Sequence, residues 1–142
     1  PGPPHNKPHG HAIVTGAAGG IGRALVSRFA AEGYRVIAID RIERTSDFDS
    51  VDYLQVDLQA LVADPVYAET LIGEISKCSS EVGLDMLIND AAIQILRGAE
   101  TLSLEDCRRT LDVSLLAPFR LTQVLLRDLE HASGCVVNLR LG

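Results

Sequence analysis

Thr15-Gly16-Ala17-Ala18-Gly19-Gly20-Ile21-Gly22 is the stretch that decides the fold of this chain. It follows a short apolar run at 12–14 and leads into a helix-like run at 23–30, so a strand, a glycine-rich turn and a helix start come in that order. Glycines let the turn close tightly and let the backbone approach a phosphate without a Cβ in the way. Because the first N–H groups of a helix lack intrahelical partners and lie at the positive end of its dipole, the stretch predicts a cradle for a pyrophosphate.

An acidic residue at a suitable distance supports this interpretation. Asp40 stands at the end of a second apolar run, 35–39. A carboxylate there is placed to hydrogen-bond a ribose 2′-hydroxyl and would repel a 2′-phosphate, which favours NAD over NADP. The neighbouring Arg41 would partly offset that repulsion. The alternative for Asp40 is a solvated residue at a strand end.

Strand-like and helix-like segments alternate along the chain. Near-continuous apolar strands indicate burial on both faces, as in a parallel sheet covered by helices. Right-handed crossovers then predict an α/β fold, a doubly wound, Rossmann-like parallel sheet with strand order 3-2-1-4-5. The expected strands are 11–15, 35–39, 53–56, 86–89 and 135–139, and the expected helices are 20–32, 65–77 and a long one over 103–131.

Local signals mark the ends of these elements. Gly33 is suited to end the first helix, and Pro65 to begin the second. Ser103 is expected to cap the long helix, with Asp106 three residues later. The polar stretch 41–52 is expected to be a loop with a short turn at most.

Composition restricts the class of protein. The 142 residues suit one domain with a real core, and hydrophobic and charged fractions of 46% and 23% are ordinary for a soluble globular protein. The net charge of −6 argues against a nucleic-acid partner. No apolar run approaches the roughly 20 residues that a membrane span needs.

The cysteines and the first residues set the expected location and boundaries. Cys78, Cys107 and Cys135 form no Cys-x-x-Cys pair and fit reduced thiols in a cytoplasmic protein. No secretory signal is visible. The proline-rich segment 1–10 is expected to be a flexible leader, and 11–142 one dinucleotide-binding domain. Histidines of the leader could bind a metal adventitiously, but no metal site is expected.

Taken together, these motifs resemble the short-chain dehydrogenase/reductase family. The family's Thr-Gly-x-x-x-Gly-x-Gly pattern is matched by residues 15–22, and its Asp-aliphatic pair after the third strand by Asp57 and Leu58. Its Asn-Asn-Ala-Gly after the fourth strand appears in altered form as Asn89-Asp90-Ala91-Ala92. The resemblance extends from about His11 to Leu139.

The resemblance implies hydride transfer between a nicotinamide cofactor and a small-molecule alcohol or carbonyl compound. It places Asp57 and Leu58 at the adenine, and Asn89 to Ala91 at the adenosine ribose. The expected cofactor is NAD, with NADP less favoured. The expected cofactor-binding residues are Gly16, Ala18, Gly19, Gly20, Ile21, Gly22, Asp40, Arg41, Asp57, Leu58, Asn89, Ala91 and Ala92.

The catalytic residues of the family are only partly matched. Its Tyr-x-x-x-Lys pair is absent, and the sequence ends at Gly142, before that segment would come. Ser114 stands in the place of the catalytic Asn, and Leu141 in that of the catalytic Ser. Since Pro118 has no N–H for the Ser114 carbonyl, we expect a kink that leaves this carbonyl free for part of the catalytic role. The alternative is a helical serine beside a structural kink.

Asp90 stands where the family has an asparagine whose amide binds neighbouring strands. An ionised carboxylate only accepts hydrogen bonds, so this position either loses donors or holds a proton.

The long helix carries more apolar residues than one packing face requires. Its first stripe is Leu111, Leu115, Phe119, Thr122 and Leu126, which Leu116, Leu121, Val124 and Leu125 broaden. A helix on one side of a sheet needs a single stripe, so the surplus predicts a second packing partner. The resemblance implies a homo-oligomer through helix 103–131. The alternative is packing within the chain.

We therefore expect the NAD-binding part of a short-chain dehydrogenase/reductase, with its sheet truncated after the fifth strand and no turnover by this chain alone. The alternative is a catalytically inactive dinucleotide-binding or interaction module. An unrelated nucleotide binder has little support, since the sequence has neither a Gly-x-x-x-x-Gly-Lys-Ser/Thr loop nor a Gly-x-Ser-x-Gly elbow.

Overall fold

A computed structural model describes residues 10–78, 83–93 and 95–139 of the chain. Its strands form one parallel sheet in the order β3-β2-β1-β4-β5, which confirms the predicted topology. The strands are β1 (His11–Thr15), β2 (Arg35–Asp40), β3 (Asp52–Gln55), β4 (Met86–Asn89) and β5 (Cys135–Asn138). The α-helices are α1 (Gly20–Ala31), α2 (Leu58–Ala63), α3 (Pro65–Cys78), α4 (Leu104–Leu111), α5 (Ala117–Val124) and α6 (Leu126–Ala132).

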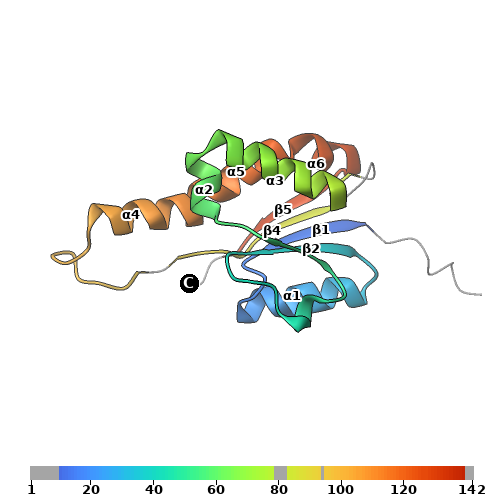
Figure 1. The fold of residues 1–142 in the computed structure, drawn as a ribbon, viewed down its shortest axis with the longest axis horizontal. Helices are drawn as coiled ribbons and strands as arrows, with labels where there is room; N and C mark the ends of the chain where they lie inside the picture. The colour runs from blue at the N-terminus through green and yellow to red at the C-terminus, as the bar shows by residue number, and fades with distance from the viewer. Residues whose placement is uncertain (1–9, 79–82, 94, 140–142) are drawn as a thin grey trace, which may run out of the picture.

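Helices cover both faces of the sheet (Figure 1). On one face, alternate strand residues such as Ile13, Ile37 and Leu87 pack in a buried cluster with residues of α2, α3, α5 and α6. On the other face, Val14 and Ile88 pack in a second cluster with residues of α1. Burial on both faces explains why the central strands are continuously apolar.

The register brings the ends of the strands together at one edge. Thr15 at the end of β1 is paired with Ile39 on one side and with Asn89 on the other, and Asn89 is paired with Asn138. The segments that follow β1, β2 and β4 therefore begin next to one another, which is where a doubly wound sheet places its ligands.

The predicted local signals are confirmed at three helix ends. Pro65 is the first residue of α3. Gly33 has a φ of 89°, and its N–H bonds the Ala30 carbonyl just after α1. The Ser103 hydroxyl accepts the N–H of Asp106 at 3.1 Å and caps α4.

The prediction of one helix over 103–131 is wrong in detail. A π-helical segment (Asp112–Leu116) follows α4, and a single residue, Leu125, separates the end of α5 at Val124 from α6. The π-helical segment lies just before Pro118, whose missing N–H disfavours regular α-helical bonding at this point. The helix thus changes type beside Pro118, while the expected kink and the free Ser114 carbonyl stay predictions.

One helix of the structure was not predicted. Residues 58–63, left between the third strand and the second helix, form α2. In the stretch 41–52, the short turn is a 3₁₀ helix (Ser46–Phe48), and its Phe48 is buried against the face that α1 covers.

The described chain begins at Gly10, which is buried and whose carbonyl accepts the Arg35 N–H at 2.9 Å. The other residues of the expected leader, 1–9, lie outside the described residues, as does Leu141. The division into a leader and one domain stays a prediction. None of the helices in the described ranges is long and apolar enough to cross a membrane.

Candidate dinucleotide-binding site

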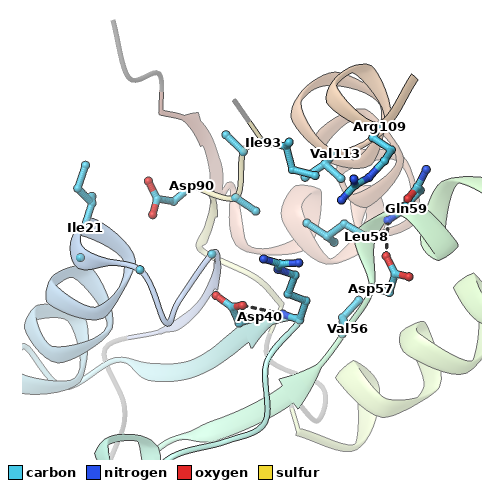
Figure 2. Close-up of a pocket in the computed structure, with 16 residues that line it drawn as sticks. Ile21, Asp40, Val56, Asp57, Leu58, Gln59, Asp90, Ile93, Arg109 and Val113 are labelled. Atoms are coloured by element: carbon cyan, nitrogen blue, oxygen red, sulfur yellow. Dashed lines mark hydrogen bonds between the residues drawn. The ribbon is translucent and has the colours of Figure 1, made fainter. Parts of the chain in front are cut away.

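A cavity of about 680 Å³ lies at the carboxyl ends of the strands (Figure 2). Its walls come from the glycine turn, the ends of β2 and β3, the segment after β4, and the α4 region. Of the predicted cofactor-binding residues, the following line it: Gly16, Gly19, Gly20, Ile21, Asp40, Arg41, Asp57, Leu58, Ala91 and Ala92. Ala18, Gly22, Asn89 and Ser114 are not among the lining residues.

The glycine turn requires glycine at two positions. Gly16 has a φ of 66°, and a Cβ there would come within 2.8 Å of the Ala91 nitrogen. A Cβ on Gly22 would overlap the Gly16 carbonyl oxygen. Gly20 differs, since a Cβ there would meet nothing within 4 Å, although the residue lines the cavity. Gly16 and Gly22 therefore shape the turn, whereas Gly20 leaves the cavity wall without a side chain at its position.

Asp40 joins the end of β2 to the glycine turn. Its Oδ2 accepts the N–H of Ala18 at 2.9 Å, and its Oδ1 accepts the N–H of Arg41 at 2.7 Å. Ala18 therefore supports the site through its backbone and through Asp40. A carboxylate held this way is fixed at the cavity wall before any ligand arrives.

Thr15 connects the turn to the segment after β4. Its Oγ1 accepts the N–H groups of Asp90 and Ala91 at 3.2 and 3.1 Å. This anchoring was not predicted, although Thr15 is the first residue of the motif. The signal that could have revealed it is the position of a hydroxyl at a strand end, beside the neighbouring strand.

Asn89 is turned into the sheet. It is buried, and its Nδ2 donates to the Asn138 Oδ1 at 2.9 Å on the neighbouring β5. The side chain thus holds β4 to β5, while the expected contact of Asn89 with the adenosine ribose stays a prediction.

Asp57 shapes the far end of the cavity. Its Oδ1 accepts the N–H of Gln59 at 3.0 Å and caps α2, while its own N–H is bound by the Tyr67 hydroxyl at 2.8 Å. The lining residues that the sequence analysis missed gather mainly around this end or on the helices beside it: Val56, Gln59, Ile93, Arg109 and Val113. Arg109 and Val113 come from a distant part of the chain, so only the tertiary fold brings them here.

Two of the lining residues are arginines without an acidic partner. Arg23, Arg28, Arg35, Arg44 and Arg97 each form an ion pair. Within the described ranges, neither Arg41 nor Arg109 forms one. Both guanidinium groups are available to an anionic or aromatic ligand.

Ser114 holds the segment after β4 in place. Its hydroxyl accepts the Ile93 N–H at 3.2 Å, and it lies in the π-helical segment. Its catalytic role stays a prediction.

Asp90 lines the cavity beside the start of α1 (Figure 2). Burial raises the pKa of its carboxyl group above the ordinary value, while a hydrogen bond from the Gly22 backbone N–H acts in the opposite direction.

No group of three or more metal-ligating side chains occurs in the part of the chain that the structure describes. The three cysteines are free thiols.

A doubly wound parallel sheet with a glycine turn facing a cavity at its carboxyl edge defines a nucleotide-binding class of α/β protein. The chain belongs to the short-chain dehydrogenase family, whose model matches residues 10–140.

Similar proteins include two bacterial polyol dehydrogenases. The chain is 32% identical over 137 residues to D-threitol dehydrogenase of Mycolicibacterium smegmatis, and 30% identical over 131 residues to NAD-dependent glycerol dehydrogenase of Listeria innocua. Each match covers 90% of this chain and 51% of the relative. The chain thus spans about half the length of these curated relatives.

Among solved structures, a similar one is an oxidoreductase of this family from Brucella ovis in complex with a partially ordered NAD. The identity is 30% and the TM-score 0.78, with 91% of this chain and 61% of that chain covered.

Proposed function

We propose that this chain is the dinucleotide-binding part of an oxidoreductase that transfers a hydride between NAD and a small alcohol or carbonyl compound. The observation that carries the proposal is the bare wall of the cavity at Gly19 and Gly20, next to the N-terminus of α1. This arrangement offers backbone N–H groups and a helix dipole to a pyrophosphate. The NAD complex of the Brucella ovis structure supports the same ligand.

The choice of NAD over NADP depends on Asp40. Its fixed carboxylate is placed for a ribose 2′-hydroxyl and against a 2′-phosphate. Arg41 and Arg109 line the same cavity, have no acidic partner among the described residues, and oppose this preference. The name of the Listeria relative supports NAD.

The cofactor supplies hydride chemistry, and this chain's residues bind and orient it. Ile21 and the glycines would hold the phosphates, Leu58 and Val113 the adenine, and Ala91 and Ala92 the ribose. The polyols named in the two relatives support a small hydroxylated substrate for the whole protein.

The sequence of this chain does not contain the tyrosine and lysine pair that the family pattern uses for turnover. No tyrosine in it has a lysine four positions later, so a phenol activated as a general base is missing. The chain alone binds a dinucleotide and does not turn over. The dehydrogenase relatives favour an oxidoreductase over an inactive interaction module.

The structure also supports a homo-oligomer. Leu111, Leu115 and Phe119 are 52%, 60% and 63% exposed, whereas Leu121 and Leu125 are buried. Packing within the described chain therefore accounts for Leu121 and Leu125 but not for the first stripe, and Leu116 of the broadening set is also 41% exposed. A second copy is the partner proposed for this stripe, and the free thiols support a reducing compartment such as the cytoplasm.

The test of binding is an NADH titration of the wild-type chain and of Gly20→Ala. The added methyl group meets open space in the protein but stands where the pyrophosphate would lie. Gly20→Ala should therefore cost at least one charge-assisted hydrogen bond to the pyrophosphate. That loss weakens NADH binding by about ten- to a hundredfold.

The matched control is Gly73→Ala in α3, where an added Cβ also meets nothing within 4 Å. It should bind NADH like the wild type and melt at a higher temperature. Equal NADH affinity of Gly20→Ala and wild type, or no binding by the wild type, would contradict the proposal.

A further inference from the structure

The starting observation is an acidic side chain at the helix end that the proposed pyrophosphate would use. Asp90 follows β4, its backbone is fixed by the Thr15 hydroxyl, and its carboxylate accepts the N–H of Gly22 in the first turn of α1. Figure 2 shows it beside Ile21. A residue distant in sequence thus supplies a negative charge to this helix terminus.

The helix itself supplies no such charge. Its N-cap is Gly19, which has no side chain, and its first turn contains no acidic residue. An ionised Asp90 and a pyrophosphate would both lie at the positive end of the same helix dipole. Two negative charges there repel each other, more strongly at a partly buried position than in water.

No cation holds Asp90 in its charged form. Arg23 on α1 pairs with Asp47, and none of the ion pairs in the described part of the chain includes Asp90. The other charged residues lining the cavity are Asp40 and Arg41 after β2, Asp57 after β3, and Arg109 on α4. The Gly22 N–H favours the ionised carboxylate.

We propose that Asp90 takes up one proton from solvent when a dinucleotide binds, so that the cavity binds the cofactor more weakly as the pH rises. This inference rests on the proposed dinucleotide site. The neutral carboxyl group removes the repulsion and gains a donor, while bound pyrophosphate stabilises the protonated form. The asparagine of the family pattern carries no proton to exchange, so this coupling belongs to this chain.

The direction of the pH dependence follows from the linkage between proton binding and dinucleotide binding. Burial already raises the pKa of Asp90 above 3.8, and a bound anion raises it further. Between the free and the bound pKa, binding takes up a proton, and the dissociation constant increases by up to about tenfold per pH unit. Below both values the affinity no longer depends on this group.

The experiment is calorimetric titration of NADH into the protein, at matched pH, in buffers of low and high ionisation enthalpy. The difference in observed heat gives the number of protons taken up, and a pH series between about 5.5 and 8.5 gives the slope of the affinity. The same measurements are made on Asp90→Asn, which keeps an oxygen acceptor for the Gly22 N–H.

A matched control is Glu69→Gln, an exposed residue on α3 that removes one negative charge far from the cavity lining. We expect the wild type and Glu69→Gln to take up the same fraction of a proton and to lose affinity with rising pH. Asp90→Asn should take up a smaller fraction of a proton than the wild type. At the alkaline end of the pH series it should also bind NADH more tightly than the wild type.

Equal proton uptake by the wild type and Asp90→Asn would overturn this inference but not the proposed function. NADH binding to the wild type without any proton uptake would have the same meaning. The wild-type result does not depend on whether the variant folds. No NADH binding by either protein at any pH would overturn the proposed function, and this inference with it.

Discussion

Asp40 shows how one side chain serves both the fold and the candidate site. Its carboxylate accepts N–H groups from Ala18 and Arg41, so it closes the glycine turn onto the end of β2. The same group lies on the cavity wall. A ribose hydroxyl would therefore meet an acceptor whose position is already fixed, which reduces the entropy lost on binding.

Asp40→Ala should weaken NADH binding by about tenfold or more, since a hydrogen bond to a charged group contributes about 1.5–3 kcal/mol. NADPH binding should improve relative to NADH, because the charge that repels the 2′-phosphate is gone while Arg41 and Arg109 remain. Parallel titrations with the two cofactors measure the ratio. Asp40→Asn, which keeps an acceptor without the charge, separates the two effects, and unchanged affinities for both cofactors would remove Asp40 from the site.

At the scale of elements, α4 is the least supported helix of the described fold. None of its residues is buried, and it extends away from the sheet in Figure 1. Its order depends on local terms, namely the Ser103 cap, acidic residues in its first turn and arginines in its last. Yet α4 carries Arg109, which lines the cavity, so the stability of α4 affects the order of the cavity wall.

Ser103→Ala should destabilise α4 by about 1 kcal/mol. Because no residue of α4 is fully buried, the loss should appear as local opening, with hydrogen exchange of its amides up to about five times faster. The melting temperature of the whole protein should change little. Ser103→Asp keeps a capping acceptor and is expected to exchange like the wild type. A large drop in melting temperature would instead show that α4 unfolds with the core.

At the scale of the whole molecule, an exposed apolar stripe runs along α4, the π-helical segment and α5. It includes Leu111, Leu115 and Phe119. Exposed apolar groups gathered on one continuous helical segment are typical of an interface, whereas scattered ones are ordinary.

Sedimentation velocity should show a dimer or larger species for the wild type, and a monomer for Leu115→Asp, since a buried unpaired charge opposes association. Val66→Asp is the matched control, because Val66 on α3 is 69% exposed and lies outside the stripe. Its sedimentation should equal that of the wild type. A monomeric wild type at high concentration would contradict the proposed homo-oligomer.

The sequence alone was sufficient for the sheet and for its glycine turn. Burial on both faces makes β1, β2 and β4 continuously apolar, and handed crossovers leave few strand orders to choose from. Gly16 and Gly22 were also predictable, since a positive φ and a close backbone approach each exclude a Cβ. The Ser103 cap is local and was read directly from its spacing.

Contacts between distant segments were decided by the tertiary structure. Asn89 bonds across the sheet to Asn138, Asp90 reaches the Gly22 N–H, and Arg109 reaches the cavity from α4. A sequence motif specifies which polar groups stand at a strand end, but not which neighbour will satisfy them. That choice depends on register and packing, because a buried polar group bonds whichever partner the fold brings within reach.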